Sequence, residues 1–430
     1  MTAMNGDEPH HGTRGAGRVA IPGNYLFALT DGGGTVPPEL GVARRLVDRG
    51  HQVSVLADES MGGETRATGA SFLPWSVPPT GELRDWERQS PMSLARNTVE
   101  HMITGPAPGQ ARDVAAALER MQPGLVVTSF FALGAMVAAE AKRVPFNVLI
   151  PNIYGLPAKG MPPGGVGLAP AHGPLGRLRD RGARKSVTWL FDRYALVPVN
   201  ALRTEYGLDP VATTWNQVQH ANLQLILTSP AFDFPGALPD NARYVGPVLD
   251  DPAWADDADW TEPTGAGPLV LVAMSSTFQN HVECLQRIID ALGTLLVRGV
   301  VTTGPAIKVE DLRAPANVSV FAAAPHAEVM RKASVVITHG GHGTVIKALA
   351  AGLPLVILHH GRDQADNAVR VTARGAGIAV PRRAPSGRIA AAVSTVLGSP
   401  AYATAAAQLG RAVARDAAAN HAMLLDALEN

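Results

Sequence analysis

Apolar residues recur along the chain in two alternating patterns. Short runs rich in valine, leucine and isoleucine, such as 53–56 and 335–337, alternate with longer stretches that have an apolar residue at every third or fourth position. The short runs predict buried parallel strands, and the longer stretches predict amphipathic helices that cover a sheet. The predicted strands are 25–30, 52–57, 125–128, 146–150, 223–227, 269–273, 300–303, 318–321, 335–338 and 355–358, and the predicted helices are 39–49, 134–142, 282–296, 387–397 and 401–428. This alternation is typical of α/β folds with a doubly wound parallel sheet.

The alternation is interrupted at one place, which divides the chain. Residues 249–267 are acidic, contain two prolines and have no period. The chain of 430 residues is also too long for one ordinary hydrophobic core. We therefore expect a flexible extension at 1–23, a Rossmann-like domain at 24–248, a linker at 249–267 and a second Rossmann-like domain at 268–400. The remaining helix, 401–430, could pack back on the first domain.

Residues 151–198 form an irregular stretch with many prolines, glycines and arginines. A long insertion of this kind is typically a binding loop or a lid. Apolar residues here and in the segment after 52–57 are candidates for a hydrophobic pocket, although packing under the loops explains each of them equally well. These candidates are Trp75, Trp86, Tyr154, Met161, Trp189 and Phe191.

Charge and composition restrict the partners. The chain has 37 basic and 37 acidic side chains and 46% apolar residues. A balanced charge argues against a nucleic-acid or anionic-membrane surface, so we expect small molecules or proteins as partners. No apolar run has the length of a membrane helix, and the single cysteine, Cys284, cannot form an internal disulfide, which fits the cytoplasm. His10 and His11 have no further ligands nearby, so no metal site is expected.

A glycine loop between a strand and a helix carries the clearest chemical signal. It spans 339–344 with the sequence His-Gly-Gly-His-Gly-Thr, and Gly352 and Pro354 end the helix that follows. A helix that begins behind a glycine loop presents unpaired N–H groups and a partial positive charge, which favour a phosphate ligand. Neither the P-loop spacing nor the G-x-G-x-x-G spacing is present here. The loop therefore predicts a diphosphate site of another type.

Three further motifs accompany the glycine loop: the pair Pro325-His326, the Gly-Leu-Pro of 352–354 and the Asp-Gln-Ala-Asp-Asn of 363–367. Together with the loop they resemble the sugar-nucleotide signature of family-1 glycosyltransferases, the GT-B-fold enzymes that use UDP- or dTDP-sugars on natural products. In the first half, 34–38, 49–51 and 245–247 resemble the pattern of the same family. The resemblance covers nearly the whole chain and implies two facing doubly wound Rossmann-like domains with a cleft between them.

The resemblance also implies roles for individual residues. Those that would hold the donor diphosphate are Ser276, Thr277, His339, Gly341, Gly343 and Thr344. Pro325 and His326 would lie along the base, and Asp363 and Gln364 would bind sugar hydroxyls. Departure of a nucleoside diphosphate needs hydrogen-bond donors and positive potential aimed at the phosphates, which agrees with the glycine loop. No metal or other cofactor is needed in this interpretation.

The chain departs from the family pattern at three positions. Thr35 stands where the catalytic histidine is usual, and Ser129 stands where the aspartate that orients this histidine is usual. Threonine cannot act as a general base near neutral pH, so the candidate base among these catalytic positions is Asp31, whose alternative role is to hold its loop in an Asx turn. Lys347 replaces a glutamate that accepts hydrogen bonds from ribose, which slightly favours a dTDP-sugar over a UDP-sugar.

We therefore expect a cytoplasmic, inverting glycosyltransferase. The second domain would mainly bind a dTDP-sugar or UDP-sugar, and the first would mainly bind a hydrophobic small-molecule natural product as acceptor. No nucleic-acid partner and no membrane span are expected, and a homodimer stays open. Two other functions also stay open. The missing His/Asp pair would suit an auxiliary protein of the GT-B shape that activates a partner glycosyltransferase, and a sugar-nucleotide epimerase would share the architecture.

Overall fold

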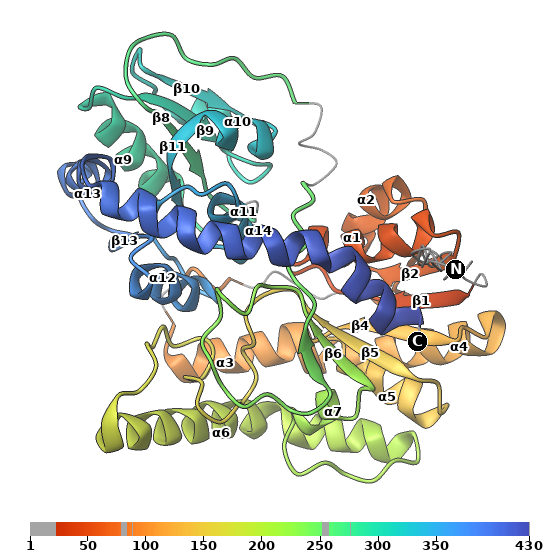
Figure 1. The fold of residues 1–430 in the computed structure, drawn as a ribbon. Helices are drawn as coiled ribbons and strands as arrows, with labels where there is room; N and C mark the ends of the chain where they lie inside the picture. Colours follow the sequence, from red (N-terminus) through yellow and green to blue (C-terminus); the bar gives the residue numbers. More distant parts are fainter. Residues whose placement is uncertain (1–22, 79–83, 88, 252–257, 276, 430) are drawn as a thin grey trace, which may run out of the picture.

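The computed structural model describes residues 23–78, 84–87, 89–251, 258–275 and 277–429, which form two parallel α/β domains (Figure 1). The first has a seven-stranded sheet with the order β3-β2-β1-β4-β5-β6-β7, and the second has a six-stranded sheet with the order β10-β9-β8-β11-β12-β13. Every strand pair within the two sheets is parallel. The strand order reverses beside β1 in one sheet and beside β8 in the other, and ligands bind at such switch points. The expected pair of doubly wound domains is confirmed.

The first domain is built around strands that are buried on both faces, which explains their near-continuous apolar runs. Its strands are β1 (Asn24–Ala28), β2 (Gln52–Ala57), β3 (Ser71–Pro74), β4 (Leu125–Ser129), β5 (Phe146–Ile150), β6 (Leu223–Ile226) and β7 (Ala242–Tyr244). Its helices are α1 (Val36–Asp48), α2 (Gly62–Ala67), α3 (Pro91–Val99), α4 (Ala107–Met121), α5 (Leu133–Ala141), α6 (Gly173–Glu205) and α7 (Asn216–Gln219). Helices α4 and α5 touch at Gly134, where a Cβ would lie 1.9 Å from the Ala107 carbonyl oxygen.

The second domain repeats this arrangement with shorter connections. Its strands are β8 (Leu269–Ala273), β9 (Arg298–Thr302), β10 (Val318–Phe321), β11 (Ala333–Thr338), β12 (Leu355–Ile357) and β13 (Gly377–Ala379). Its helices are α9 (Val282–Gly293), α10 (His326–Lys332), α11 (His342–Ala350), α12 (Gln364–Ala373) and α13 (Ser386–Gly398), followed by α14 (Pro400–Glu429). One apolar cluster lies on each face of the sheet, so this domain has its own core.

The segment 151–198 is less irregular than its composition predicts, because α6 begins inside it at Gly173 and continues to Glu205. Only the second half of α6 carries an apolar stripe, in which Ala195, Val199 and Leu202 are buried. The arginine-rich first half is largely exposed, so it shows no helical period in apolar residues. The predicted end of the irregular segment at Pro198 is therefore wrong, because Pro198 lies within this helix.

Helix α14 begins on the second domain and ends on the first (Figure 1). Its first half packs on α11, and the side-chain amide of Asn420 then donates to the carbonyl oxygens of Val245 and Gly246 at 2.8 and 2.9 Å. At its end, Glu429 pairs with Arg49 at 3.1 Å and with His51 at 2.9 Å. The helix therefore ties the two domains together.

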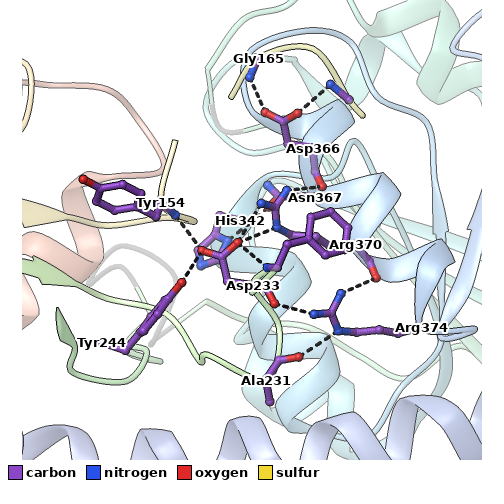
Figure 2. A network of polar contacts seen from close by, with 12 residues as sticks. Tyr154, Gly165, Ala231, Asp233, Tyr244, His342, Asp366, Asn367, Arg370 and Arg374 are labelled. Carbon is purple, nitrogen blue, oxygen red and sulfur yellow. Dashed lines mark hydrogen bonds and ion pairs between the residues drawn. The ribbon is translucent and has the colours of Figure 1, made fainter. Parts of the chain in front are cut away.

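A buried ion pair joins the two domains (Figure 2). Asp233 follows β6 and accepts hydrogen bonds from the Tyr154 amide and the Tyr244 hydroxyl, both at 2.9 Å. Its carboxylate lies 2.8 Å from Arg370 of α12, and its carbonyl accepts from Arg374 at 2.6 Å. Both partners of the ion pair are almost completely buried. This contact fixes α12 against the first domain.

The other side of α12 is held by the insertion. Asp366 accepts hydrogen bonds from the amides of Gly165 and Gly167 at 2.5 and 2.7 Å (Figure 2). The insertion of the first domain therefore reaches the helix that begins at the predicted sugar-binding residue Gln364.

Candidate active site

A cavity of about 650 Å³ lies between the domains, at the carboxyl ends of the central strands. Its wall on the first domain is mainly apolar and includes Trp75, Val77, Pro91, Leu94, Ala95, Met102, Phe130, Phe131, Ile150, Ile153, Leu156, Val187, Leu190, Phe191 and Trp215. The polar lining includes Asp31, Thr35, Glu39, Asp58 and Ser129 from the first domain and Thr277, His360, Arg362 and Asp363 from the second. A pocket of this size and composition suits a drug-sized apolar molecule.

The six apolar candidates from the sequence fall into two groups. Trp75 and Phe191 line the cavity. Tyr154 and Met161 are buried away from it, Trp86 packs edge-on against Phe278, and 55% of the surface of Trp189 is exposed. The aromatic residues that the sequence reasoning missed are Phe130, Phe131 and Trp215.

The glycine loop turns sharply between the end of β11 and the start of α11. Gly340 has a φ of 94°, and the first intrahelical hydrogen bond of α11 runs from the Val345 amide to the Gly341 carbonyl. The amides of His342, Gly343 and Thr344 therefore precede the hydrogen-bond ladder and point out of the helix end.

His339 stands directly in front of this helix end and is almost fully buried. Burial lowers its pKa to about 3, and the nearby His360, His281 and Arg362 add to this effect. The imidazole is therefore neutral at physiological pH and can donate one hydrogen bond. A Cβ on Gly341 would lie 2.6 Å from Nε2 of His339, so only glycine leaves room for the ring.

The two domains meet at the mouth of the cavity. Thr277 accepts a hydrogen bond from Arg362 at 3.1 Å, and Arg362 also pairs with Asp85 of the first domain at 2.5 Å. Gly33 has a φ of 70°, and a Cβ there would lie 2.6 Å from Cγ2 of Thr277. The loop after β1 thus touches Thr277, a residue of the second domain that is predicted to bind the diphosphate. Ser276, which is predicted to bind it as well, lies outside the described residues.

The predicted sugar-binding pair is split by the structure. Asp363 lines the cavity, and its carboxylate accepts a hydrogen bond from Asn367 at 3.0 Å. Gln364 is buried; its side-chain oxygen accepts from the His360 amide at 2.7 Å, and its nitrogen donates to Gln279 at 3.0 Å. Gln364 braces the loop before α12 in this state, and its contact with a sugar stays a prediction.

The predicted base-binding pair lies at the start of α10 and away from the apolar cavity. The ring of His326 lies 3.0 Å from the Thr302 hydroxyl, and burial lowers its pKa to about 4. The side chain of Lys347 is held in place by residues 250 and 251. Its ammonium group donates hydrogen bonds to the Asp251 carboxylate at 2.5 Å and to the Asp250 carbonyl at 2.7 Å.

Asp31 forms the Asx turn that was its alternative role. One carboxylate oxygen accepts from the Gly33 amide at 2.8 Å, and the other accepts from the Ser60 hydroxyl at 2.7 Å. The side chain also lines the cavity, so its role as a base stays a prediction.

The sequence reasoning missed Glu39, which lies one helical turn after Thr35 in the first turn of α1. Its side chain is fully buried, and one carboxyl oxygen accepts from the Ser129 hydroxyl at 2.9 Å. The other oxygen, Oε1, has no hydrogen-bond partner among the described residues. Burial raises the pKa of Glu39 to about 8; the Ser129 hydrogen bond opposes this rise, and the charge of Asp31 adds to it. The four-residue spacing from Thr35 was the available signal.

The described residues contain neither a cluster of metal-ligating side chains nor a single helix that could span a membrane. Within the described ranges, no three histidine, cysteine or carboxylate side chains gather as metal ligands. No single described helix has the length and apolar composition needed to cross a membrane, and α13 with α14 meets that test only as a pair bent by 72°.

Comparison with known proteins agrees with the observed fold. Residues 286–422 match the family model of the erythromycin biosynthesis protein CIII-like C-terminal domain. The 4'-demethylrebeccamycin synthase of Lentzea aerocolonigenes is 30% identical over 417 residues, which cover 94% of this chain and 99% of that protein. The solved kitacinnamycin glycosyltransferase has a TM-score of 0.74 at 22% identity, covering 95% of this chain and 99% of its own. The spinosyn rhamnosyltransferase solved with thymidine diphosphate has a TM-score of 0.68 at 19% identity, covering 94% and 100%. The chain therefore belongs to the family-1 glycosyltransferases of natural-product biosynthesis and is an enzyme of the GT-B fold.

Proposed function

We propose that the protein transfers a sugar, with inversion at the anomeric carbon, from a dTDP-sugar to a hydrophobic and largely aromatic small molecule. The observation that carries this proposal is the placement of a single cavity between an apolar wall on the first domain and polar loops of the second. A UDP-sugar is the alternative donor.

The donor side of the proposal rests on hydrogen-bond donors that follow two neighbouring strands, β8 and β11. The neutral imidazole of His339 and the amides at the start of α11 would bind the diphosphate, and Thr277 would approach it from β8. Such donors stabilise the charge that develops on the leaving diphosphate. No resident cofactor is needed for this step. Pro325 and His326 would face the base, and Asp363 the sugar hydroxyls.

The choice of dTDP rests on the region near Lys347. Its ammonium group is already held by Asp250 and Asp251, and an ammonium group cannot accept a hydrogen bond from a ribose 2′-hydroxyl. A donor without that hydroxyl loses nothing at this position. The thymidine diphosphate bound to the spinosyn rhamnosyltransferase supports the same choice.

The acceptor side of the proposal rests on the aromatic wall. Trp75, Phe130, Phe131, Phe191 and Trp215 offer large, flat apolar surfaces, which suit an aromatic or polyketide-like aglycone. Bringing the acceptor into a closed cavity also excludes water, which would otherwise compete for the sugar.

The test combines binding with product formation. At 100 times its dissociation constant, a ligand adds about 2.7 kcal/mol to the free energy of unfolding, so a melting scan with dTDP, UDP, GDP and ADP should rank dTDP first. The purified chain alone, given dTDP-sugars and aromatic aglycones, should form a product whose anomeric configuration is opposite to that of the donor. Equal stabilisation by all four nucleotides would refute the donor assignment. Product that appears only with a second protein, or sugar isomerisation without acceptor, would refute the transfer.

A further inference from the structure

Sugar transfer to a hydroxyl or amine needs a group that takes the proton of the acceptor. The usual histidine is replaced here by Thr35, and the usual aspartate by Ser129. In the structure both positions lie beside a third residue, Glu39, whose carboxyl group accepts a hydrogen bond from the Ser129 hydroxyl. Rather than a lost dyad, the cavity contains a different pair.

We propose that Glu39 is the catalytic base that removes the acceptor's proton, with Ser129 as its positioning residue. The inference rests on the proposed transfer to an acceptor bound in the cavity. Glu39 and Ser129 both line that cavity, together with Thr35.

Helix geometry explains why a carboxylate at 39 reaches the loop. Side chains in a helix lean toward its amino terminus, so residue 39 covers the surface one turn earlier, next to Thr35. Threonine is small and makes no capping hydrogen bond there, which leaves room for the longer glutamate. The carboxyl group therefore reaches the part of the cavity that a side chain at 35 would otherwise fill.

The hydrogen bonds of Glu39 are incomplete in a way that indicates a ligand. Oε2 accepts from Ser129, and Ser129 in turn accepts from the Thr30 amide at 3.2 Å, which fixes its orientation. Oε1 is buried and has no partner among the described residues. A buried oxygen without a partner costs about 1–3 kcal/mol, and an acceptor N–H or O–H would remove that cost.

The surroundings make the carboxylate an unusually strong base. Because burial disfavours the charged form, the ionised carboxylate of Glu39 has a higher proton affinity than that of an exposed glutamate. The Ser129 hydroxyl partly offsets this effect by stabilising the anion, so that the pKa of Glu39 stays at about 8 and the base forms as the pH rises through that value. The other titratable side chains that line the cavity are Asp31, Asp58, Asp85, His101, Arg184, His360, Arg362, Asp363 and Asp366.

The proposed step is balanced without a further reactant. The O–H or N–H bond of the acceptor breaks and its proton moves to Oε1 of ionised Glu39. The acceptor atom forms a bond to the anomeric carbon as the bond from that carbon to the phosphate oxygen breaks. The electron pair leaves with the nucleoside diphosphate, and solvent later removes the proton from Glu39.

Asp31 is the competing base, and its bonding differs from that of Glu39. Both of its carboxylate oxygens accept hydrogen bonds within the loop, from Gly33 and Ser60, and its side chain is exposed. It has the bonding of a residue that shapes the loop. Its charge lies close enough to Glu39 to raise the pKa of that group.

The test compares variants in a transfer assay with a dTDP-sugar and an aromatic aglycone. For Glu39→Gln we expect kcat to fall about 10²- to 10⁴-fold, with the dTDP dissociation constant unchanged by calorimetry. Glu283→Gln is the matched control, because Glu283 also lies in the first turn of a helix but its side chain is 93% exposed. It should match the wild type.

The pH profile separates a base from a structural residue. In the wild type, kcat should rise toward a plateau above pH 8. For Ser129→Ala the midpoint should move up by about 0.5–1 pH unit, because the lost hydrogen bond favoured the anion. A Glu39→Gln variant with more than a third of wild-type kcat, or an unmoved midpoint in Ser129→Ala, would overturn the assignment. If the wild type itself formed no product with any donor and acceptor pair, the proposed function would fail instead.

Discussion

Replacing Glu39 by glutamine should stabilise the folded protein at alkaline pH and leave its stability unchanged at acid pH. Folding raises the pKa of this carboxyl from 4.5 to about 8, so the folded protein binds a proton that the unfolded chain has lost. Between these two pH values the contribution of Glu39 to the free energy of unfolding falls as the pH rises, and above them this contribution is constant. At about 1.4 kcal/mol per pKa unit, the loss reaches about 4–5 kcal/mol above pH 8. Glutamine is neutral at every pH and does not suffer this loss.

The assay is urea unfolding of both proteins at pH 5 and pH 8.5, followed by tryptophan fluorescence. The difference in free energy between variant and wild type isolates Glu39 from other carboxyls with raised pKa values, such as Asp58 and Glu64. Glu283→Gln serves as the exposed control. A difference that stays the same at the two pH values would refute the idea that Glu39 is buried and protonated, and with it the basis for its role as a base.

Four further predictions concern the donor site and the domain interface. His339→Ala should weaken dTDP binding at least about tenfold by calorimetry, because a charge-assisted hydrogen bond contributes about 1.5–3 kcal/mol. Gly341→Ala should have a similar effect, since its Cβ would displace the His339 ring; Gly387→Ala, in open space, is the control, and equal affinities would count against the predicted contact. Asp233→Asn should lower the free energy of unfolding by about 3–5 kcal/mol, because Arg370 is left buried without a counter-charge; an unchanged urea midpoint would contradict this. Dialysis against EDTA should leave the transfer rate unchanged, and a loss restored by Mg²⁺ would show that the diphosphate needs a metal.

The sheets and the glycine loop were predictable from the sequence because their signals are local. A buried parallel strand reads as a continuous apolar run, and a loop such as 339–344 needs its glycines whatever surrounds it. Gly341 is an example, because a Cβ at this position would collide with the ring of His339, only two residues away.

The features that were missed depend on residues far apart in the sequence. The contact between Glu39 and Ser129 spans 90 residues, and no periodic pattern announces it. Phe130 and Phe131 directly follow β4, where their exposure to a cavity depends on the opposite wall. Helix α6 was missed for another reason, since most of its first half faces solvent and carries no apolar period. The available signal for Glu39 was its position four residues after Thr35, which places both residues on the same side of α1.

The path of helix α14 bears on how hybrid enzymes could be made from this protein. Its first half follows the second domain, where Gly410 lies against the Leu349 carbonyl. From Asp416, whose carboxylate accepts a hydrogen bond from the Ser229 hydroxyl at 2.5 Å, the helix follows the first domain. A chimera that imports a foreign second domain after the linker would therefore bring with it a helix end that does not match the first domain. The second crossover belongs between Gly410 and Asp416, so that the last turns come from the same parent as the first domain on which they pack.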